Sequence, residues 1–546
     1  MLFLLPLIAA LVISMAIIPV MVRMAPVLGM IDKPDPRKVH AVPIPRVGGV
    51  GIVIGAVLPV MLLLPLDPSL LSYMFGALVL LGFGAWDDSH ELGHYVKFIG
   101  QFIAVLAVVY YGDVYVTHLP LMEGEPIPET VGRIFTVIAM VGMINAINHS
   151  DGLDGLAGGE SLMSLVCIAW LSWQAGGTTT TIVALSTIGG LFGFLRFNTH
   201  PARIFMGDGG SQFLGFTLAY LAVVLTQEVN PAMSPASALL ILGLPIADIL
   251  AVFAQRIYKK MNWFRASRNH IHHRLLDLGF HHHESVVIVY SVQALLVMCA
   301  VTMPYEADLL LIGIYLGVVA VLFIALYMVE SHGWHVRGKY DEAVLDEMIE
   351  ATVRSKWFLY ISYGIVFYGV SAFLLAGALV ATAIPVDFTI AAAALFVLLL
   401  LRLVAGYSGR FIPLRLLLYM TVIFVVYLLN TYQPAYLLGA DVVTYVFFGM
   451  FVVAIGLSIR FMHEGDFNVT PTDFLVVLAL LLLIVLTGTH LVDSGITAIA
   501  LKSIILFYGV ELVLNRMKSR WNMVTVSALL SLLVISIRGL LEAWSL

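Results

Sequence analysis

The sequence contains few charged residues and very little cysteine. Only 11% of its 546 residues are charged and 61% are hydrophobic, a composition that excludes an ordinary soluble domain. Its two cysteines, Cys167 and Cys299, lie in separate apolar segments, which excludes a disulfide framework and the cysteine spacing typical of zinc sites. Strictly alternating segments are missing as well, which argues against a transmembrane β-barrel. A helical membrane protein is the class that remains.

Apolar segments of about 18 or more residues recur along the chain, and each can cross a bilayer as a helix. No basic residue precedes the first segment, so we interpret it as a transmembrane helix with its N-terminus outside and not as a signal peptide. We predict an all-α polytopic membrane protein with about eleven helices in residues 1–329, a charged cytoplasmic linker at 330–356 and about seven further helices in residues 357–546. A scaffold or dimerisation role is the simplest interpretation of the C-terminal helices. The predicted helices lie near residues 3–22, 48–66, 70–86, 97–112, 132–148, 161–175, 180–196, 211–226, 236–255, 286–303, 308–328, 357–381, 387–404, 413–430, 441–461, 472–490, 495–514 and 522–540.

The basic residues gather on alternate loops. If loops are assigned to the two sides in turn, starting outside, all of the 28 Lys and Arg residues except Arg133, Lys502 and Arg538 fall on one side. The positive-inside rule makes that side cytoplasmic. The acidic motifs and the histidine-rich loop 256–283, described next, fall on the same side, although loop polarity alone does not require this.

Short acidic segments lie where apolar helices end or begin. Asp87 and Asp88 close one helix, and Lys97 opens the next, where a cation opposes the helix dipole unless it binds an anion. Asp208 follows Gly207 at the start of another helix, whose free N–H groups can meet a phosphate. No Gly-Lys-Ser or Gly-Lys-Thr follows these glycines, so the turn is not a nucleotide-binding P-loop.

The most polar of these segments is residues 145–159. Asn145 and Asn148 are three residues apart and share one face of a helix end, and Asp151 and Asp154 repeat that spacing. Oxygen ligands of this kind suit Mg²⁺, which proteins usually hold with one or two carboxylates and the phosphates of a substrate. The segment therefore predicts a site for a divalent cation and a phosphate at the inner membrane face.

A dense histidine cluster precedes Arg274 in the loop 256–283. Three histidines within four residues do not easily converge on one ion and no cysteine is nearby, so we disfavour a zinc site here. Histidines beside an arginine fit the binding of a diphosphate. A second run, residues 281–283, is more simply explained as a solvated loop. The members of the first cluster are His270, His272, His273 and Arg274.

Two further segments carry candidate substrate-binding residues. Residues 38–49 place Lys38 and Arg46 among prolines and glycines near the lipid headgroups, and anionic lipid explains these charges as well as catalysis does. Residues 197–211 carry Asn198 ahead of the turn at Asp208.

Together these motifs resemble the polyprenyl-phosphate N-acetylhexosamine-1-phosphate transferases of glycosyltransferase family 4, over about residues 1–328. The His-Ile-His-His-Arg-Leu segment at 270–275 and the Pro-Ile-Pro-Arg-Val-Gly-Gly segment at 43–49 are similar to the WecA/TagO-like branch. One departure is Gly209, where the family more often has Ser or Thr. The C-terminal helices lie outside the resemblance.

The resemblance implies an Mg²⁺-dependent enzyme, with Mn²⁺ as the alternative ion. It would transfer N-acetylhexosamine 1-phosphate, with GlcNAc as the expected sugar, from a UDP-sugar to polyprenyl (undecaprenyl) phosphate and release UMP, a first membrane step in cell-envelope glycan synthesis such as that of lipopolysaccharide O-antigen or teichoic acid. It implies a multi-pass protein of a bacterial or archaeal plasma membrane, surrounded by lipid, with its site facing the cytoplasm. A homodimer is the oligomer to consider, and no nucleic-acid partner is expected.

The resemblance also assigns roles to residues. Asp208 is expected to bind the metal, with Asp88 or Asp151 assisting, and Asp87 is expected to position or deprotonate the lipid phosphate. Two alternative functions stay open: an MraY-like phospho-MurNAc-pentapeptide transferase, and a transporter, for which Asp248 within a helix is the notable charge in the first domain and Lys502 and Glu511 are the notable charges in the C-terminal helices. The sequence also leaves open whether an aspartate attacks first and forms a covalent intermediate. The expected catalytic residues are Asp87, Asp88, Lys97, Asp151 and Asp154. The expected substrate-binding residues are Lys38, Arg46, Asn145, Asn148, Asn198, His270, His272, His273 and Arg274.

Overall fold

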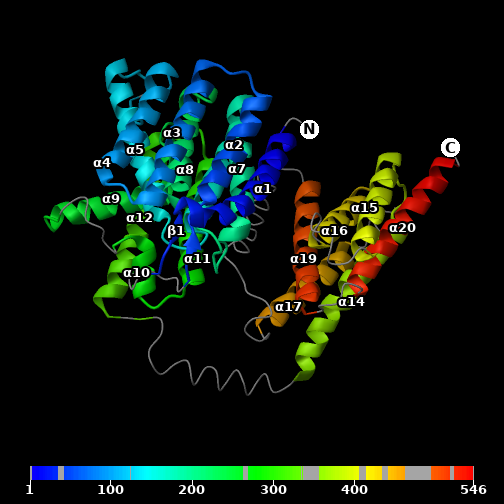
Figure 1. Ribbon diagram of the computed structural model, residues 1–546. Coiled ribbons are helices and arrows are strands. Elements are labelled where there is room, and N and C mark those ends of the chain that lie inside the picture. The colour runs from blue at the N-terminus through cyan, green and yellow to red at the C-terminus, as the bar shows by residue number, and fades with distance from the viewer. Residues whose placement is uncertain are drawn as a thin grey trace. The chain divides into compact units, whose positions relative to one another are not determined.

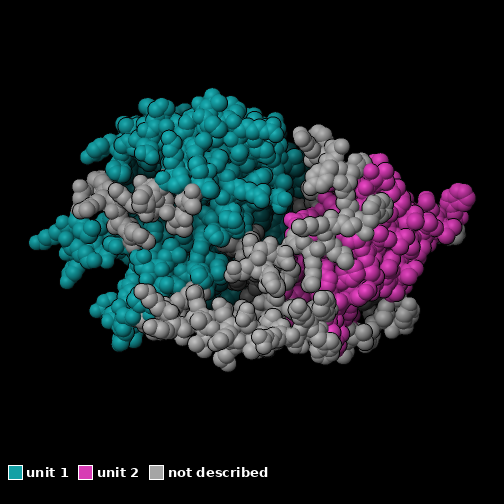
Figure 2. All heavy atoms as spheres, turned by 60° about the horizontal axis from the view of Figure 1, so that its bottom comes forward, with its two compact units in different colours: residues 1–338, 470–478 teal, residues 339–469, 479–546 magenta. Residues whose placement is uncertain are grey.

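The computed structural model is predominantly helical (Figure 1). It divides into two compact units, the first formed by residues 1–338 with 470–478 and the second by the remainder (Figure 2). The residues that the structure describes are 3–34, 42–122, 124–261, 269–333, 335, 356–404, 414–432, 441–460, 494–516 and 522–544.

The first unit contains every helix predicted for residues 1–329, and one additional short helix, α10. The described elements are α1 (Leu4–Leu28), β1 (Ile31–Asp32), β2 (Ile44–Pro45), α2 (Gly48–Leu63), α3 (Pro68–His90), α4 (His94–Leu106), the π-helical turn η1 (Ala107–Tyr111), α5 (Glu129–Ser150), α6 (Leu156–Gln174), α7 (Thr178–Asn198), α8 (Gly207–Val224), the π-helical turn η2 (Leu225–Val229), α9 (Ser237–Tyr258), α10 (Ile271–Asp277), α11 (His282–Thr302) and α12 (Asp308–Ser331).

The second unit has its own apolar core, which includes Val370, Val425, Phe451 and Val510. The predicted helix near residues 472–490 lies outside the described residues. Across the described chain, 14 helices are long and apolar enough to cross a membrane, so the predicted all-α polytopic fold is confirmed. The described helices of this unit are α14 (Lys356–Val380), α15 (Val386–Val404), α16 (Leu414–Thr431), α17 (Asp441–Arg460), α19 (Ser494–Arg516) and α20 (Met523–Trp544).

Helix α8 is the central helix of the first unit and is buried along its length. It packs against α2, α3 and α5, and glycines allow these backbones to touch (Figure 1). A Cβ on Gly84 of α3 would lie 2.2 Å from the Gly209 Cα atom, and a Cβ on Gly49 of α2 would lie 2.3 Å from the Gly210 nitrogen. Both contacts are at the end of α8 that carries Asp208, so they fix the acidic motifs next to one another.

Two short antiparallel strands precede α2, and the second of them is hydrogen-bonded to the segment just before α8. Strands β1 and β2 are antiparallel, with Ile31 opposite Pro45. Phe205 N–H donates to Pro45 O (2.8 Å), and Gly48 N–H donates back to Phe205 O (2.9 Å). The loop that carries Arg46 is therefore held beside the turn that carries Asp208.

Helix α9 bends sharply at Gly243, whose backbone angles are not helical and which lies two residues before Pro245. The polar groups that the bend frees find partners on other helices, as buried backbone in a membrane requires. Gln293 of α11 accepts the Leu244 N–H through Oε1 (3.0 Å), and Tyr315 of α12 donates its hydroxyl to Gly243 O (3.1 Å). The bend directs the second half of α9 toward the histidine cluster.

Candidate active site

Lys97 lies between two carboxylates that different helices contribute. Its Nζ atom is 2.7 Å from Asp87 Oδ2 at the end of α3 and 2.7 Å from Asp208 Oδ2 in the first turn of α8. Lys97 is in the first turn of α4, where the helix dipole disfavours a cation. The two carboxylates offset that cost, so groups from three separate helices form one charged cluster.

Asp88 stabilises the start of α8. Its Oδ1 atom accepts the Asp208 N–H (3.0 Å) and its Oδ2 atom accepts the Gly209 N–H (3.4 Å), which are groups without partners in the first turn of a helix. Gly207 has φ +71°, and a Cβ there would lie 2.4 Å from Asp88 Oδ2, so this turn requires glycine. Asp88 thus positions Asp208. Its assignment as a metal ligand stays a prediction.

Amide side chains orient the Asp208 carboxylate. Asn148 Nδ2, at the end of α5, donates to Asp208 Oδ1 (3.2 Å) and to Ser211 Oγ (2.8 Å). Gln212 Nε2 donates to Asp208 Oδ2 (3.3 Å) from one helical turn further along α8. Motif reasoning did not identify Gln212, although its spacing of four residues from Asp208 puts the two side chains on one face.

Asn145 acts through an intermediate residue. Its Nδ2 atom donates to Gln101 Oε1 (2.8 Å), and Gln101 Nε2 donates in turn to Gln212 Oε1 (3.3 Å). Gln101 and Gln212 are both buried. The two predicted asparagines therefore have different roles. Asn148 contacts Asp208 directly, whereas Asn145 contacts Gln101, which in turn contacts Gln212.

Asp151 is half-buried in the loop between α5 and α6. Burial, reinforced by the carboxylates of Asp208 and Asp154 and opposed by Arg46, raises its pKa to about 7. Arg46 itself forms an ion pair with Asp32 at 2.5 Å. An excess of negative charge thus surrounds Asp151, and one added cation would relieve it.

The donor set of the cluster fits a magnesium ion. Asp87 and Asp208 present carboxylate oxygens on either side of one lysine, and Asp151 carries a third carboxylate whose charged form is disfavoured without a cation. Hard oxygen donors of this kind, together with substrate phosphate, are what Mg²⁺ takes in proteins. Asp208, with Asp88 or Asp151, is the group that would hold such an ion.

Asp248 positions the histidine cluster. Its Oδ2 atom lies 2.8 Å from His270 Nδ1, and its Oδ1 atom accepts the Ile271 N–H at 2.9 Å, at the start of α10. Asp248 is the buried charge on which the transporter alternative rested, and it therefore has structural partners in His270 and the Ile271 N–H. His270 in turn stacks on His149 of α5, with ring centroids 5.1 Å apart, so the cluster lies against the end of α5.

Arg274 forms a bidentate ion pair with Glu330 near the end of α12. Its Nε atom donates to Oε1 (2.7 Å) and its NH2 atom donates to Oε2 (2.9 Å). The pair joins α10 to α12. The predicted binding of the donor diphosphate by Arg274 stays a prediction.

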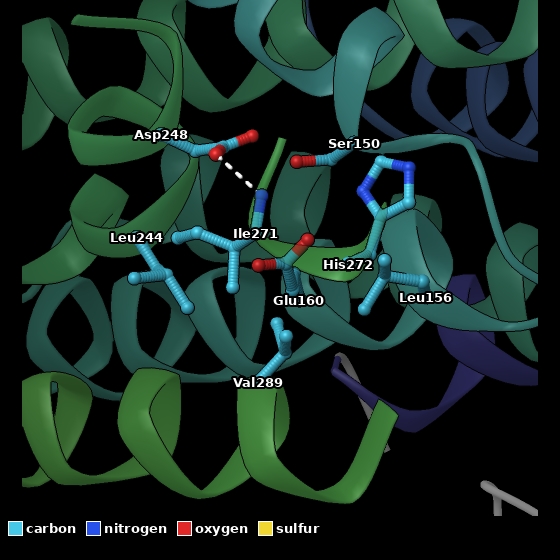
Figure 3. A pocket seen from close by; sticks show the side chains of 8 residues that line it. All are labelled: Ser150, Leu156, Glu160, Leu244, Asp248, Ile271, His272 and Val289. Carbon is cyan, nitrogen blue, oxygen red and sulfur yellow. Dashed lines mark hydrogen bonds between the residues drawn. The ribbon is translucent and has the colours of Figure 1, made fainter. Parts of the chain in front are cut away.

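His272 and Glu160 line a small pocket of about 10 Å³ between α5, α6, α9, α10 and α11 (Figure 3). Neither His272 Nε2 nor Glu160 Oε2 has a hydrogen-bond partner among the described residues. Burial lowers the pKa of His272 well below its usual value, and the neighbouring histidines lower it further. A Cβ on Gly152 would lie 2.2 Å from His272 Nε2, so the neutral imidazole packs directly on the loop that carries Asp151. His273 lies beside it, with ring centroids 4.2 Å apart.

Asn198 fixes two loops to each other. Its Nδ2 atom donates to Ile204 O (2.9 Å) and its Oδ1 atom accepts the Gly155 N–H (2.9 Å). Because the backbone occupies both ends of this buried amide, the structure gives Asn198 a structural role, and its predicted contact with substrate stays a prediction. Lys38 lies outside the described residues.

The chain is similar in sequence to known transferases. A model of glycosyl transferase family 4 matches residues 70–226. A probable undecaprenyl-phosphate N-acetylglucosaminyl 1-phosphate transferase of Bacillus subtilis is 30% identical over 289 residues, which are 52% of this chain and 80% of that protein. The undecaprenyl-phosphate alpha-N-acetylglucosaminyl 1-phosphate transferase of Escherichia coli K12 is 30% identical over 290 residues, 52% of this chain and 79% of that protein. Its namesake in Haemophilus influenzae is 29% identical over 322 residues, 57% of this chain and 88% of that protein.

Proposed function

Since the chain belongs to glycosyl transferase family 4, as its motifs predict, we propose that it transfers N-acetylglucosamine 1-phosphate from UDP-GlcNAc to undecaprenyl phosphate. The observation that carries the proposal is the contact of Lys97 with both Asp87 and Asp208, because it unites residues of three helices in one charged cluster. The relatives are named as undecaprenyl-phosphate N-acetylglucosaminyl 1-phosphate transferases, and they match the chain over most of their own length.

The reaction exchanges one phosphoric anhydride for another. An oxygen of the lipid phosphate attacks the phosphorus that carries the sugar, the bond from that phosphorus to the bridging oxygen breaks, and UMP leaves with the electron pair. The products are UMP and a lipid diphosphate sugar. Because both substrates are anionic, the site must offset their repulsion, and positioned cations are the means.

The residues of the cluster divide this work. Asp87 accepts a hydrogen bond from the Leu92 N–H (2.6 Å), which leaves its Oδ2 atom for Lys97 and for an incoming lipid phosphate. Lys97, released from one carboxylate, neutralises phosphate oxygens. Asp87 takes up any proton that the lipid phosphate still carries.

A magnesium ion held by Asp208, with Asp88 or Asp151, would neutralise charge on the diphosphate. Asn148 and Gln212 orient the Asp208 carboxylate for this. The neutral His272 imidazole packs against the Asp151 loop, and it carries an N–H that can donate to a donor phosphate or to the N-acetyl group.

We place the reaction at the cytoplasmic face of a plasma membrane. The multi-pass fold supports a membrane location, and the bacterial relatives support a bacterial one. The distribution of Lys and Arg supports an inward-facing site with the N-terminus outside. UDP-sugars are soluble and the acceptor phosphate lies at the interface, so the two meet there.

The test is UMP release by the full chain in detergent with UDP-GlcNAc, undecaprenyl phosphate and Mg²⁺. The informative variant is Lys97→Met, because it removes two charge-assisted contacts worth about 1.5–3 kcal/mol each and leaves two carboxylates to repel. We expect turnover to fall by about 10²-fold or more. Lys502→Met, which replaces a lysine that contacts Asn430 in a helix of the second unit, is the control and should retain activity. Equal activity of the two variants would refute the role of Lys97.

A further inference from the structure

Three segments that lie apart in the sequence bring metal-ligating side chains together. Asp154 comes from the loop before α6, His200 from the loop before α8, and His282 is the first residue of α11. Each offers one ligand atom, and these atoms all lie within 4.8 Å of one another. The His200 and His282 rings have centroids 4.2 Å apart. This cluster shares no residue with the contacts of Lys97.

His282 is the unusual member of the cluster. Both of its ring nitrogens are buried, and neither has a hydrogen-bond partner among the described residues. A neutral imidazole carries one N–H donor and one acceptor nitrogen, and leaving both without a partner in a buried place costs free energy. Buried polar groups therefore rarely stay unpaired. His281 and Glu284 form a capping box at the start of α11, which fixes the backbone of the turn that carries His282.

The other two residues already contact each other. Asp154 Oδ2 lies 2.7 Å from His200 Nδ1 and accepts the Ala202 N–H at 3.0 Å. A carboxylate that orients an imidazole next to a second, unpaired imidazole is close to a three-ligand arrangement. Bound zinc has N and O ligands at about 2.0–2.2 Å, so small side-chain rotations suffice to bring these ligand atoms around one ion.

We propose that Asp154, His200 and His282 bind a transition-metal ion of the zinc type, with water as a further ligand. Two imidazoles and one carboxylate suit zinc or cobalt and are a poor set for magnesium, which prefers oxygen. The site is therefore chemically distinct from the one at Asp208. Binding displaces the proton between His200 and Asp154.

Such an ion would join two loops of the first unit to the start of α11. One loop carries Asp151 and Asp154, and the other lies between α7 and α8 and carries His200. Asn198 and Tyr290 already tie the first loop in place, since Gly155 bonds to both through its backbone. The ion would add a ligand-based link where α11 meets these two loops.

The test is metal binding by the full chain, purified through an affinity tag without histidine and stripped with a chelator. Co²⁺ is the probe, because its visible spectrum reports imidazole ligation, and Zn²⁺ is the competitor. We expect about one Co²⁺ per chain, displaced by Zn²⁺ and not by excess Mg²⁺. His282→Ala should weaken binding by at least about 100-fold, since even loss of an outer partner costs 10–100-fold.

His283→Ala, one residue along the same helical turn, is the matched control and should bind Co²⁺ as the parent does. His200→Ala is the second variant, because its side chain is 43% exposed and its loss will not unfold the protein. The proposal is overturned if the parent chain binds Co²⁺ no more tightly than Mg²⁺. It is equally overturned if His200→Ala and His283→Ala bind Co²⁺ with the same affinity.

Discussion

Gly84→Ala tests whether the close contact of α3 with α8 sets the geometry of the site. A Cβ on Gly84 would lie 2.2 Å from the Gly209 Cα atom and 2.3 Å from the Gly209 nitrogen, which are backbone atoms that cannot rotate away. Gly82 lies on the same helix, and nothing lies within 4 Å of its Cβ position. Gly82→Ala is therefore a matched control that adds the same methyl group in open space.

The size of the effect follows from these distances. Carbon atoms in contact are about 3.5 Å apart, so the 2.2 Å approach must open by about 1.3 Å. Over-packing of this kind costs about 1–3 kcal/mol of stability. The same movement carries Asp88 away from the two N–H groups that it accepts and carries Asp208 away from Lys97. Since a displacement of 1 Å can cost about 10²-fold in rate, we expect turnover to fall by about that factor.

The assay is UMP release at saturating substrates, measured for both variants per mole of folded protein, with thermal unfolding followed in parallel. Gly82→Ala should match the parent in both measurements. Gly84→Ala should lose turnover and melt earlier. Equal turnover of the two variants would refute the reasoning, because it would show that α3 and α8 can separate without disturbing the cluster.

Four further predictions follow from the same structure. Gly209→Ser should keep full turnover in the UMP assay, because the nearest atom to a Cβ there is 3.5 Å away. His272→Ala should raise the KM for the UDP-sugar more than the KM for the lipid, as initial rates against each substrate will show. A chelator should abolish UMP release, and added Mg²⁺ should restore it. Truncation after Gly338, the end of the continuous part of the first unit, should leave a chain that still releases UMP in detergent.

Hydrophobic length and motif position predicted much of the fold. The eleven helices predicted before residue 330 are all present, because each is an apolar segment bounded by polar or Gly-rich residues. The fourth one, predicted at 97–112, consists of α4 followed by a π-helical turn that ends at Tyr111, and hydropathy predicted its length but not the π-helical turn. The convergence of Asp87, Lys97 and Asp208 was also expected, since all three lie at helix ends on one side.

The sequence could not predict which residue each polar side chain contacts. Arg274 was expected to face the donor, but Glu330 lies 56 positions along the chain and nothing local signals that pairing. Asn198 was expected to bind substrate, whereas the backbone of a separate loop takes up its amide. Such contacts depend on the packing of helices far apart in sequence, which periodicity does not encode.

The second histidine run shows the same limit. Residues 281–283 were explained most simply as a solvated loop, yet His281 caps α11 and His282 is turned inward toward Asp154 and His200. Three adjacent histidines carry no signal of which one faces inward. Glu284, three residues after His281, is the one local sign of a capping box.

The measurement that tests the central claim most directly is the turnover of Asp208→Asn. The full chain is incubated with UDP-GlcNAc, undecaprenyl phosphate and saturating Mg²⁺, and both UMP and the lipid diphosphate sugar are quantified. We predict that the parent chain forms the two products in equal amounts, and that Asp208→Asn, purified as folded protein, loses at least about 10²-fold of that turnover. Near-normal product formation by Asp208→Asn, or a parent chain that forms neither product, would contradict the account.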